Sequence, residues 1–222
     1  LIRLPNGAWC FEGDTTQVSE TTLPYDQNGF ITFGSFNNLS KVNLDVIHVW
    51  AQILNRVPNS KLLLKSNQLG EPECVDLMRK LFADEGITED RLDLLSYTPE
   101  RASHLDLYSR VDLALDTFPY NGTTTTCEAL WMATPVLTVL GDRHVARVGA
   151  SLLNRMNLNE FIAGNLADYV NKAVDFAENP SALRALRPQL RQQMLDSKLC
   201  DAKSFAHDIE NAYHQMWDQC IR

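Results

Sequence analysis

The chain has 222 residues, of which 45% are hydrophobic and 22% are charged, a composition typical of a globular protein with one large or two small domains. No apolar run approaches the roughly 18 residues of a membrane span, and a formal net charge of −8 argues against a general nucleic-acid binder. The five cysteines are scattered and include no CxxC pair, which argues against a zinc site or a disulfide framework and for a reducing compartment. We therefore expect a cytoplasmic protein without membrane or nucleic-acid partners.

The expected organisation is a lead-in segment followed by one lobe. Residues 1–28 lack sustained periodicity and read as an extended lead-in from a preceding lobe, whereas apolar runs alternate with helical patterns throughout residues 29–222. Strands are predicted at 30–36, 61–65, 91–96, 111–115, 136–140 and, briefly, 161–162. Helices are predicted to end at residue 57 and to span about 71–85, 102–109, 127–134, 145–156, 166–177, 180–195 and 203–219.

This alternation predicts an α/β fold with a doubly wound, mostly parallel, Rossmann-like sheet and extra helices at the C-terminus. Gly34 in the first strand indicates a close approach to the backbone. No GxGxxG motif follows that strand and no GxSxG motif occurs, which argues against an NAD-binding domain and an α/β-hydrolase but leaves a flavodoxin-like scaffold open. The last helix carries an apolar stripe that favours burial in the core, formed by Phe205, Ile209, Ala212, Tyr213, Met216 and Trp217.

The segment 116–135 has the composition of an anion site. It follows an apolar strand, turns at Gly122 and opens a helix with four threonines, 123–126. The first N–H groups of a helix lack internal partners and the helix dipole favours negative charge there, while threonine hydroxyls add donors. Glu128 lies about one turn beyond Thr124, so that its carboxylate could accept hydrogen bonds from a sugar hydroxyl. The plain alternative is an ordinary helix cap with a capping box.

Three further motifs, together with this one, resemble a known family. The sequence LDTFPYNGTTTTCEALWMATPVLT resembles the donor-binding signature of the protein O-GlcNAc transferase and SPINDLY family of nucleotide-sugar transferases. FGSFNNLSK is similar to the motif whose lysine contacts the donor diphosphate, which points to Lys41 and, more weakly, Asn38. HLDLYSRVDLALDT resembles the context of the family's donor-site histidine, here His104. GDRHVARVGASLL resembles a segment near the donor sugar, which makes His144 and Arg147 secondary candidates.

The resemblance implies the C-terminal lobe of a GT-B glycosyltransferase, the half that holds the nucleotide sugar. It further implies an inverting transfer to Ser or Thr of proteins, with no metal and no cofactor. Lys41 and His104 are the expected catalytic residues. The expected donor-binding residues are Asn38, Lys41, Thr98, Arg101, His104, Thr123, Thr124, Thr125 and Glu128.

The resemblance also gives expectations for the donor and for the parent chain. Thr123 and Glu128 stand where the animal O-GlcNAc pattern has His and Asp, so the turn is nearer to the SPINDLY branch. We expect UDP-GlcNAc as the donor, with GDP-fucose, used by plant SPINDLY-type enzymes, as the alternative. A non-catalytic module that binds a nucleotide or a partner is the third reading. The protein acceptor is expected to contact an N-terminal lobe and helical repeats of the parent, and the isolated lobe is expected to be inactive.

Overall fold

A computed structural model describes residues 2–13 and 22–221 of the protein, and this part of the chain forms a six-stranded sheet in the order β3-β2-β1-β4-β5-β6. Every neighbouring pair of strands is parallel. This order is that of the Rossmann fold, so the predicted doubly wound parallel sheet is confirmed. The strands are β1 (Ile31–Ser35), β2 (Ser60–Lys65), β3 (Leu92–Leu95), β4 (Leu113–Leu115), β5 (Val136–Val139) and β6 (Ile162–Ala163).

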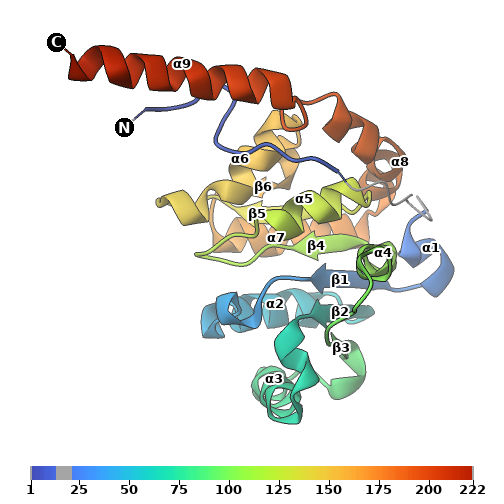
Figure 1. Ribbon diagram of the computed structural model, residues 1–222. Helices are drawn as coiled ribbons and strands as arrows, with labels where there is room; N and C mark the ends of the chain where they lie inside the picture. The colour runs from blue at the N-terminus through green and yellow to red at the C-terminus, as the bar shows by residue number, and fades with distance from the viewer. Residues whose placement is uncertain (1, 14–21, 222) are drawn as a thin grey trace.

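Helices lie on both sides of the sheet (Figure 1). One group packs α2 against α3 and α7, and another packs α5 against α6 and α8. Because both faces are covered, strands such as β1 are buried along their whole length and read as continuous apolar runs. The helices are α1 (Pro24–Asn28), α2 (Leu44–Arg56), α3 (Pro72–Asp84), α4 (Arg101–Asp106), α5 (Thr124–Trp131), α6 (Val148–Arg155), α7 (Leu166–Glu178), α8 (Ser181–Leu195) and α9 (Ala202–Cys220).

The expected close approach at Gly34 is confirmed, and the neighbour is a side chain of the core. A Cβ atom at Gly34 would lie 2.5 Å from Cγ2 of Val111, the residue that leads into β4. The absence of a side chain at Gly34 therefore lets β1 and the start of β4 lie close together.

The lead-in segment differs from the prediction of an extended chain at its end. Residues 24–28 form α1, because Pro24 suits the first helical turn and Gly29, with φ 73°, ends the helix in the left-handed region. Residues 14–21 of the expected lead-in lie outside the described residues. Residues 2–13 run against the lobe, where the N–H of Phe11 donates to the carbonyl of Leu199 at 2.8 Å.

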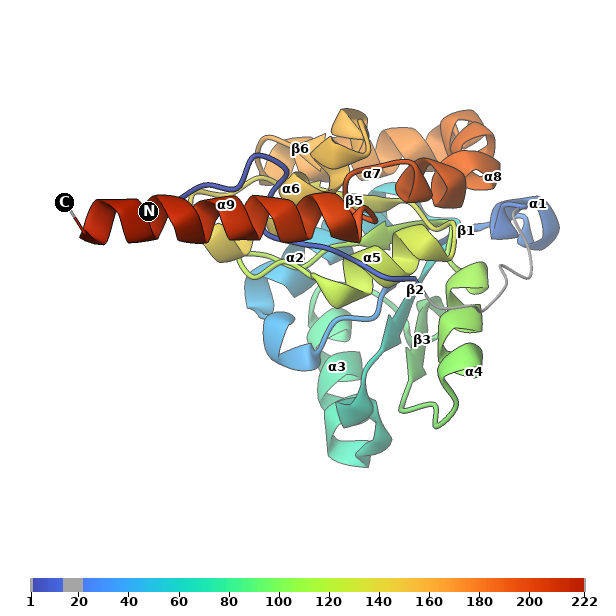
Figure 2. The ribbon, with the colours of Figure 1, turned by 45° about the horizontal axis from the view of Figure 1, so that its top comes forward.

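The apolar stripe of the last helix is mostly exposed, so it is not part of the core of the described lobe. Tyr213, Met216 and Trp217 are 65%, 41% and 66% exposed, and Ala212 is the buried residue of α9 among those the structure describes. The reason is that α9 extends past the body of the lobe in both views, so most of its apolar stripe has no described surface to pack against (Figures 1 and 2). Within residues 2–13 and 22–221, no helix is both long and apolar enough to cross a membrane.

Candidate functional site

The candidate residues lie in segments that follow the carboxyl ends of strands. Lys41 ends a short 3-10 helix, η1 (Leu39–Lys41), after β1, and His104 lies in α4 after β3. The turn at Gly122 and the start of α5 follow β4. In open parallel sheets, ligands bind at this edge, where the strand order reverses between β1 and β4. Hydrogen bonds join these segments to one another, as between Lys41 and Asn121 and between His104 and Glu128.

The turn after β4 is organised by the buried carboxylate of Asp116. Its Oδ1 accepts the N–H of Thr117 at 2.9 Å and the N–H of Gly122 at 2.6 Å, and its Oδ2 accepts the hydroxyl of Thr138 at 2.7 Å. Burial raises the pKa of Asp116 to about 7, although these hydrogen bonds and the charge of Lys41 act in the opposite direction. A carboxyl group that sequence reasoning did not single out therefore holds the turn.

Asn121 fixes the same turn from the other side. Its Nδ2 donates to the carbonyl of Thr117 at 2.9 Å, and its Oδ1 accepts the N–H of Gly149 at 3.3 Å. Its own backbone N–H donates to the carbonyl of Val145 at 2.9 Å. With its amide and backbone bonded in this way, the turn is positioned before any ligand arrives, which is the condition for electrostatic preorganisation.

Lys41 reaches this turn from the β1 side. Its Nζ donates to the carbonyl of Asn121 at 3.0 Å and lies 4.1 Å from the centre of the Tyr120 ring. Burial lowers the pKa of Lys41, and the charge of Asp116 opposes that shift. The half-buried ammonium is thus placed beside the start of α5, where it can contact an anionic group.

The four threonines have different roles. Thr123 directly precedes α5, and Thr124 is exposed in its first turn. Thr125 donates its hydroxyl to Oδ1 of Asn37 at 3.0 Å, and Thr126 donates to the carbonyl of Gly122 at 3.1 Å. Two of the hydroxyls therefore bind the protein itself, and Thr123 and Thr124 are the better placed of the four to bind a ligand.

Basic side chains from two elements, α4 and β2, lie near Glu128. Its side chain is only 7% exposed, and its carboxylate oxygens lie 3.3 Å from Nε2 of His104 and 3.6 Å from a guanidinium nitrogen of Arg101. Lys65, at the end of β2, is buried, and the charge of Glu128 opposes the lowering of the Lys65 pKa that burial causes. The neighbours hold the carboxylate in one position, from which it can accept hydrogen bonds from hydroxyl groups.

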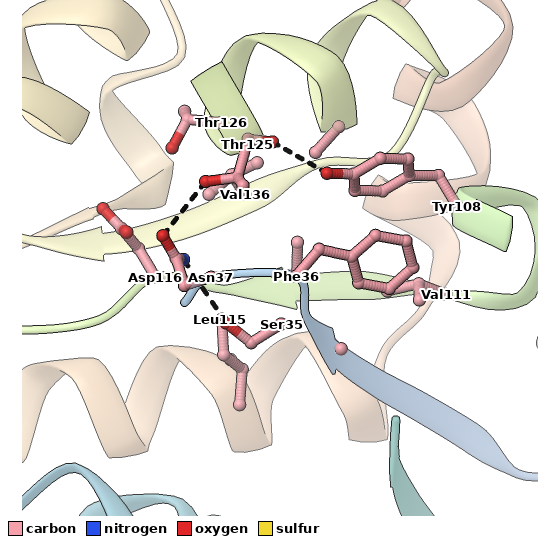
Figure 3. A pocket seen from close by; sticks show the side chains of 13 residues that line it. Ser35, Phe36, Asn37, Tyr108, Val111, Leu115, Asp116, Thr125, Thr126 and Val136 are labelled. Carbon is pink, nitrogen blue, oxygen red and sulfur yellow. Dashed lines mark hydrogen bonds between the residues drawn. The ribbon is translucent and has the colours of Figure 1, made fainter. Parts of the chain in front are cut away.

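Two expected donor contacts lie differently in the structure. Asn38 caps η1, because its Oδ1 accepts the N–H of Ser40 at 2.9 Å and Nε2 of Gln68 at 2.7 Å. The neighbouring Asn37 instead accepts the hydroxyl of Thr125 and donates to the hydroxyl of Ser35 (Figure 3). Thr98 lies in the loop between β3 and α4, and among the described residues no hydrogen bond joins it to the other candidates. Asn37, Lys65 and Asp116 are the site residues that sequence reasoning missed.

The cavity beneath the turn is too small for a nucleotide. It has a volume of about 10 Å³, close to the minimum that holds one water, and Ser35, Asn37, Asp116, Thr125 and Thr126 contribute to its lining (Figure 3). In the part of the chain that is described, no group of three or more His, Cys, Asp or Glu side chains is arranged to hold a metal ion.

The chain is similar to plant proteins along almost its whole length. A family model described as Glycosyl transferase family 41 matches residues 15–209. Proteins described as probable UDP-N-acetylglucosamine--peptide N-acetylglucosaminyltransferase SPINDLY from Hordeum vulgare and Arabidopsis thaliana are each 42% identical over 221 residues, or 98% of this chain. This chain spans 23% of the Hordeum protein and 24% of the Arabidopsis protein, about a quarter of each.

Solved structures lead to the same family. A mutant of the O-GlcNAc transferase of Thermobaculum terrenum is 32% identical with a TM-score of 0.89, and the match covers 97% of this chain and 41% of that one. Anabaena HepE in complex with UDP and glucose matches 91% of this chain and 53% of its own at 16% identity and a TM-score of 0.60, which shows a shared fold alone. These matches confirm the predicted resemblance and the predicted GT-B lobe. This chain belongs to glycosyl transferase family 41.

Proposed function

We propose that this chain is the donor-binding lobe of a glycosyltransferase that transfers GlcNAc from UDP-GlcNAc to Ser or Thr of proteins. The observation that carries the proposal is the position of the Lys41 ammonium, 3.0 Å from the carbonyl of Asn121 and beside the start of α5. Lysine and a helix start together suit a diphosphate, which carries its charge on oxygens that accept hydrogen bonds. The names of the SPINDLY relatives and of the bacterial O-GlcNAc transferase support the sugar and the acceptor class.

The proposed reaction depends on stabilising the departing nucleoside diphosphate. Negative charge develops on its phosphate as the bond to the sugar breaks. Lys41, His104 and the N–H groups at the start of α5 supply fixed donors to that charge, and each such donor is worth on the order of 2–4 kcal/mol in the transition state. In this scheme the transfer inverts the configuration at the reacting carbon of the sugar. The hydrogen-bond donors stabilise the charge of the phosphate in place of a metal ion.

Glu128 has a separate role in this proposal. Its buried carboxylate accepts hydrogen bonds from the ribose hydroxyls, while Arg101 and His104 hold it in place. The acceptor protein binds mainly to parts of the parent that precede this lobe, so the lobe alone binds the donor without transferring it. We place the parent in the cytoplasm.

GDP-fucose is the second candidate donor. The chain is 42% identical to SPINDLY proteins, and the proposed contacts to diphosphate and ribose are common to UDP and GDP. A module that binds nucleotide without catalysing transfer differs from both, since the parent would then bind a donor and transfer nothing.

Calorimetric titration tests the proposal. UDP, GDP and NAD⁺ are titrated into the wild-type chain, into Lys41→Ala, and into a matched control, Lys61→Ala, whose lysine is exposed on β2. We expect UDP to bind, Lys41→Ala to weaken binding about tenfold or more, and the control to leave it unchanged. Tighter binding of GDP would move the donor to the fucose type. Equal binding to wild type and Lys41→Ala, or a preference for NAD⁺, would contradict the proposal, and transfer by the parent carrying Lys41→Ala at the normal rate would contradict the role in catalysis.

A further inference from the structure

The carboxyl group of Asp116 lies directly behind the proposed diphosphate site. It is buried at the end of β4, and Oδ1 binds the N–H of Gly122, which belongs to the turn that opens α5. Oδ2 binds the hydroxyl of Thr138 on β5. Figure 3 shows Asp116 beside Asn37 and below the start of α5. A change in the charge of Asp116 therefore changes the electrostatic potential at the place where an anion would bind.

Two titratable side chains act on Asp116 among the described residues. Lys41, from η1, lowers the pKa of Asp116 by its positive charge, but burial raises that pKa to about 7. Tyr169, from α7, donates its hydroxyl to the carbonyl of Asp116 at 3.0 Å. Burial raises the pKa of Tyr169 well above its usual value, so that the phenol stays neutral. The protonation of Asp116 is thus balanced near neutral pH, with Lys41 as the cation that favours its ionised form.

Binding of an anion shifts the protonation equilibrium of Asp116 in two ways. The negative charge of a diphosphate at the start of α5 repels the carboxylate across the turn. A diphosphate also competes with Asp116 for the charge of Lys41. At an effective dielectric constant of about 20 and a separation of about 7 Å, one added charge raises a pKa by about one to two pH units. Both changes favour the neutral carboxyl group.

The surrounding hydrogen bonds accept the neutral form as well as the ionised one. If the proton resides on Oδ2, that oxygen becomes the donor and the hydroxyl of Thr138 becomes the acceptor, which a hydroxyl can do by rotation. Oδ1 continues to accept the N–H groups of Thr117 and Gly122. The turn therefore keeps its hydrogen bonds in both protonation states.

We propose that the binding of a nucleotide sugar at this edge takes up a proton from solvent, and that Asp116 is the residue that receives it. Asp116 is a positioning residue in this inference, because it acts through the turn and Lys41 without touching the donor. The inference rests on the proposed function. It predicts that donor affinity falls as pH rises through the neutral range, since binding must then take up a proton at a lower proton concentration.

Calorimetry in buffers of different ionisation enthalpy measures the proton uptake. UDP-GlcNAc and GDP-fucose are the probes, because a diphosphate esterified at both ends has no proton that titrates near pH 7. For the probe that binds, we expect about half to one proton taken up per ligand between pH 7 and 8, almost none at pH 5.5, and about a tenfold loss of affinity from pH 6.5 to 9. Asp116→Asn should abolish both effects, since its amide oxygen can accept both N–H groups and its NH₂ can donate to Thr138.

A second variant covers the case in which Asp116→Asn does not fold. Thr138→Val removes the donor that favours the carboxylate, so it should raise the pKa of Asp116 and move the window of proton uptake to higher pH. Donor binding without proton uptake in the wild type would overturn the inference and leave the proposed function intact. Uptake that persists in Asp116→Asn would overturn it too, by assigning the proton to another group such as the imidazole of His104. If neither probe binds, both the inference and the proposed function fail.

Discussion

Nε2 of His104 lies 3.3 Å from Oε2 of Glu128, which joins α4 to α5 across the mouth of the candidate site. Both side chains are largely withdrawn from solvent, at 23% and 7% exposed. The imidazole ring is also held by aromatic neighbours, since its centre lies 5.9 Å from that of Phe36. A carboxylate fixed in this way is preorganised to accept hydrogen bonds, and the imidazole is held in one position beside it.

If Glu128 binds the ribose, its removal should erase the preference for a hydroxylated sugar. We expect wild type to bind UDP about 10- to 100-fold more tightly than the weaker of its 2′-deoxy and 3′-deoxy analogues, because a hydrogen bond to a charged group contributes about 1.5–3 kcal/mol. In Glu128→Ala the three ligands should bind equally. Calorimetric titration measures this, with Glu85→Ala as the control because Glu85 is bonded to His48 on the surface. A preference that survives in Glu128→Ala would assign the ribose to another residue.

Much of the fold and part of the site follow from the sequence for physical reasons. Continuous apolar runs and period-3.6 patterns locate elements, and the strand ends of a parallel sheet bring their following loops together. Lys41, His104 and Glu128 were predicted in this way, together with the family resemblance. The stripe on α9 shows the limit of periodicity: it predicts which residues share a face, but the surface that would cover Trp217 depends on the rest of the assembly.

The residues that were missed depend on tertiary geometry. Asn37 and Asn38 are adjacent after β1, and the local backbone decides which amide turns toward Thr125. Lys65 reads as an ordinary charge at a strand end until β2 is placed beside the other elements. Asp116 could have been noticed, since a carboxyl group directly after an apolar run is costly unless it is bonded. Its partner Thr138, however, is brought to it only by the pairing of β4 with β5, and its partner Gly122 only by the fold of the turn after β4.

Gly149 is predicted to be required for the geometry of the turn. A Cβ atom there would lie 2.3 Å from Oγ1 of Thr138 and 2.6 Å from Oδ2 of Asp116, so that Gly149→Ala must displace this hydrogen-bonded pair. Overpacking of this kind costs about 1–3 kcal/mol, from which the better helix propensity of alanine subtracts about 1 kcal/mol. We expect urea unfolding to show a net loss of up to about 2 kcal/mol, together with weaker UDP binding. Gly70→Ala is the control, since the nearest atom to its new Cβ would be 3.7 Å away; equal effects of the two variants would contradict the prediction.

Arg187 is predicted to stabilise the lobe through a buried charge. Its guanidinium donates to the carbonyl of Val111 at 2.7 Å, and its charge lowers the pKa of the fully buried Asp112 against the effect of burial. Replacing Arg187 with Leu removes the hydrogen bond to Val111 and a positive charge that acts on Asp112, and a hydrogen bond from a charged donor contributes about 1.5–3 kcal/mol. Arg184→Leu on the same helix is the matched control, because Arg184 pairs with Asp26 at the surface, where ion pairs contribute about 0–1 kcal/mol. Urea unfolding should therefore show a loss about 1–3 kcal/mol larger in Arg187→Leu than in Arg184→Leu. A loss in Arg187→Leu no larger than in the control would contradict the stabilising role of Arg187.

The stability of the lobe is predicted to fall as pH rises from about 4 to 7. Burial raises the pKa of Asp112 to about 6 and that of Asp116 to about 7, so the folded state binds protons that the unfolded state, with its usual value of 3.8, has already lost. A pKa raised on folding contributes stability that is complete below the unfolded value and is lost as pH rises through the folded one.

Each of these two carboxyl groups should contribute about 2–4 kcal/mol to that loss. Asp26 and Asp201 act in the opposite sense, since hydrogen bonds to Arg184 and Lys198 lower their pKa values. The stability that they contribute is lost only as pH falls below about 3.8, outside the range from pH 5 to 8 in which Asp112 and Asp116 lose their protons. Urea unfolding at pH 5, 6.5 and 8 should show midpoints that decrease with pH in wild type and decrease less steeply in Asp116→Asn. Midpoints that rise between pH 5 and 8 would mean that the buried carboxyl groups are ionised throughout this range, held by their hydrogen bonds and by the charges of Lys41 and Arg187.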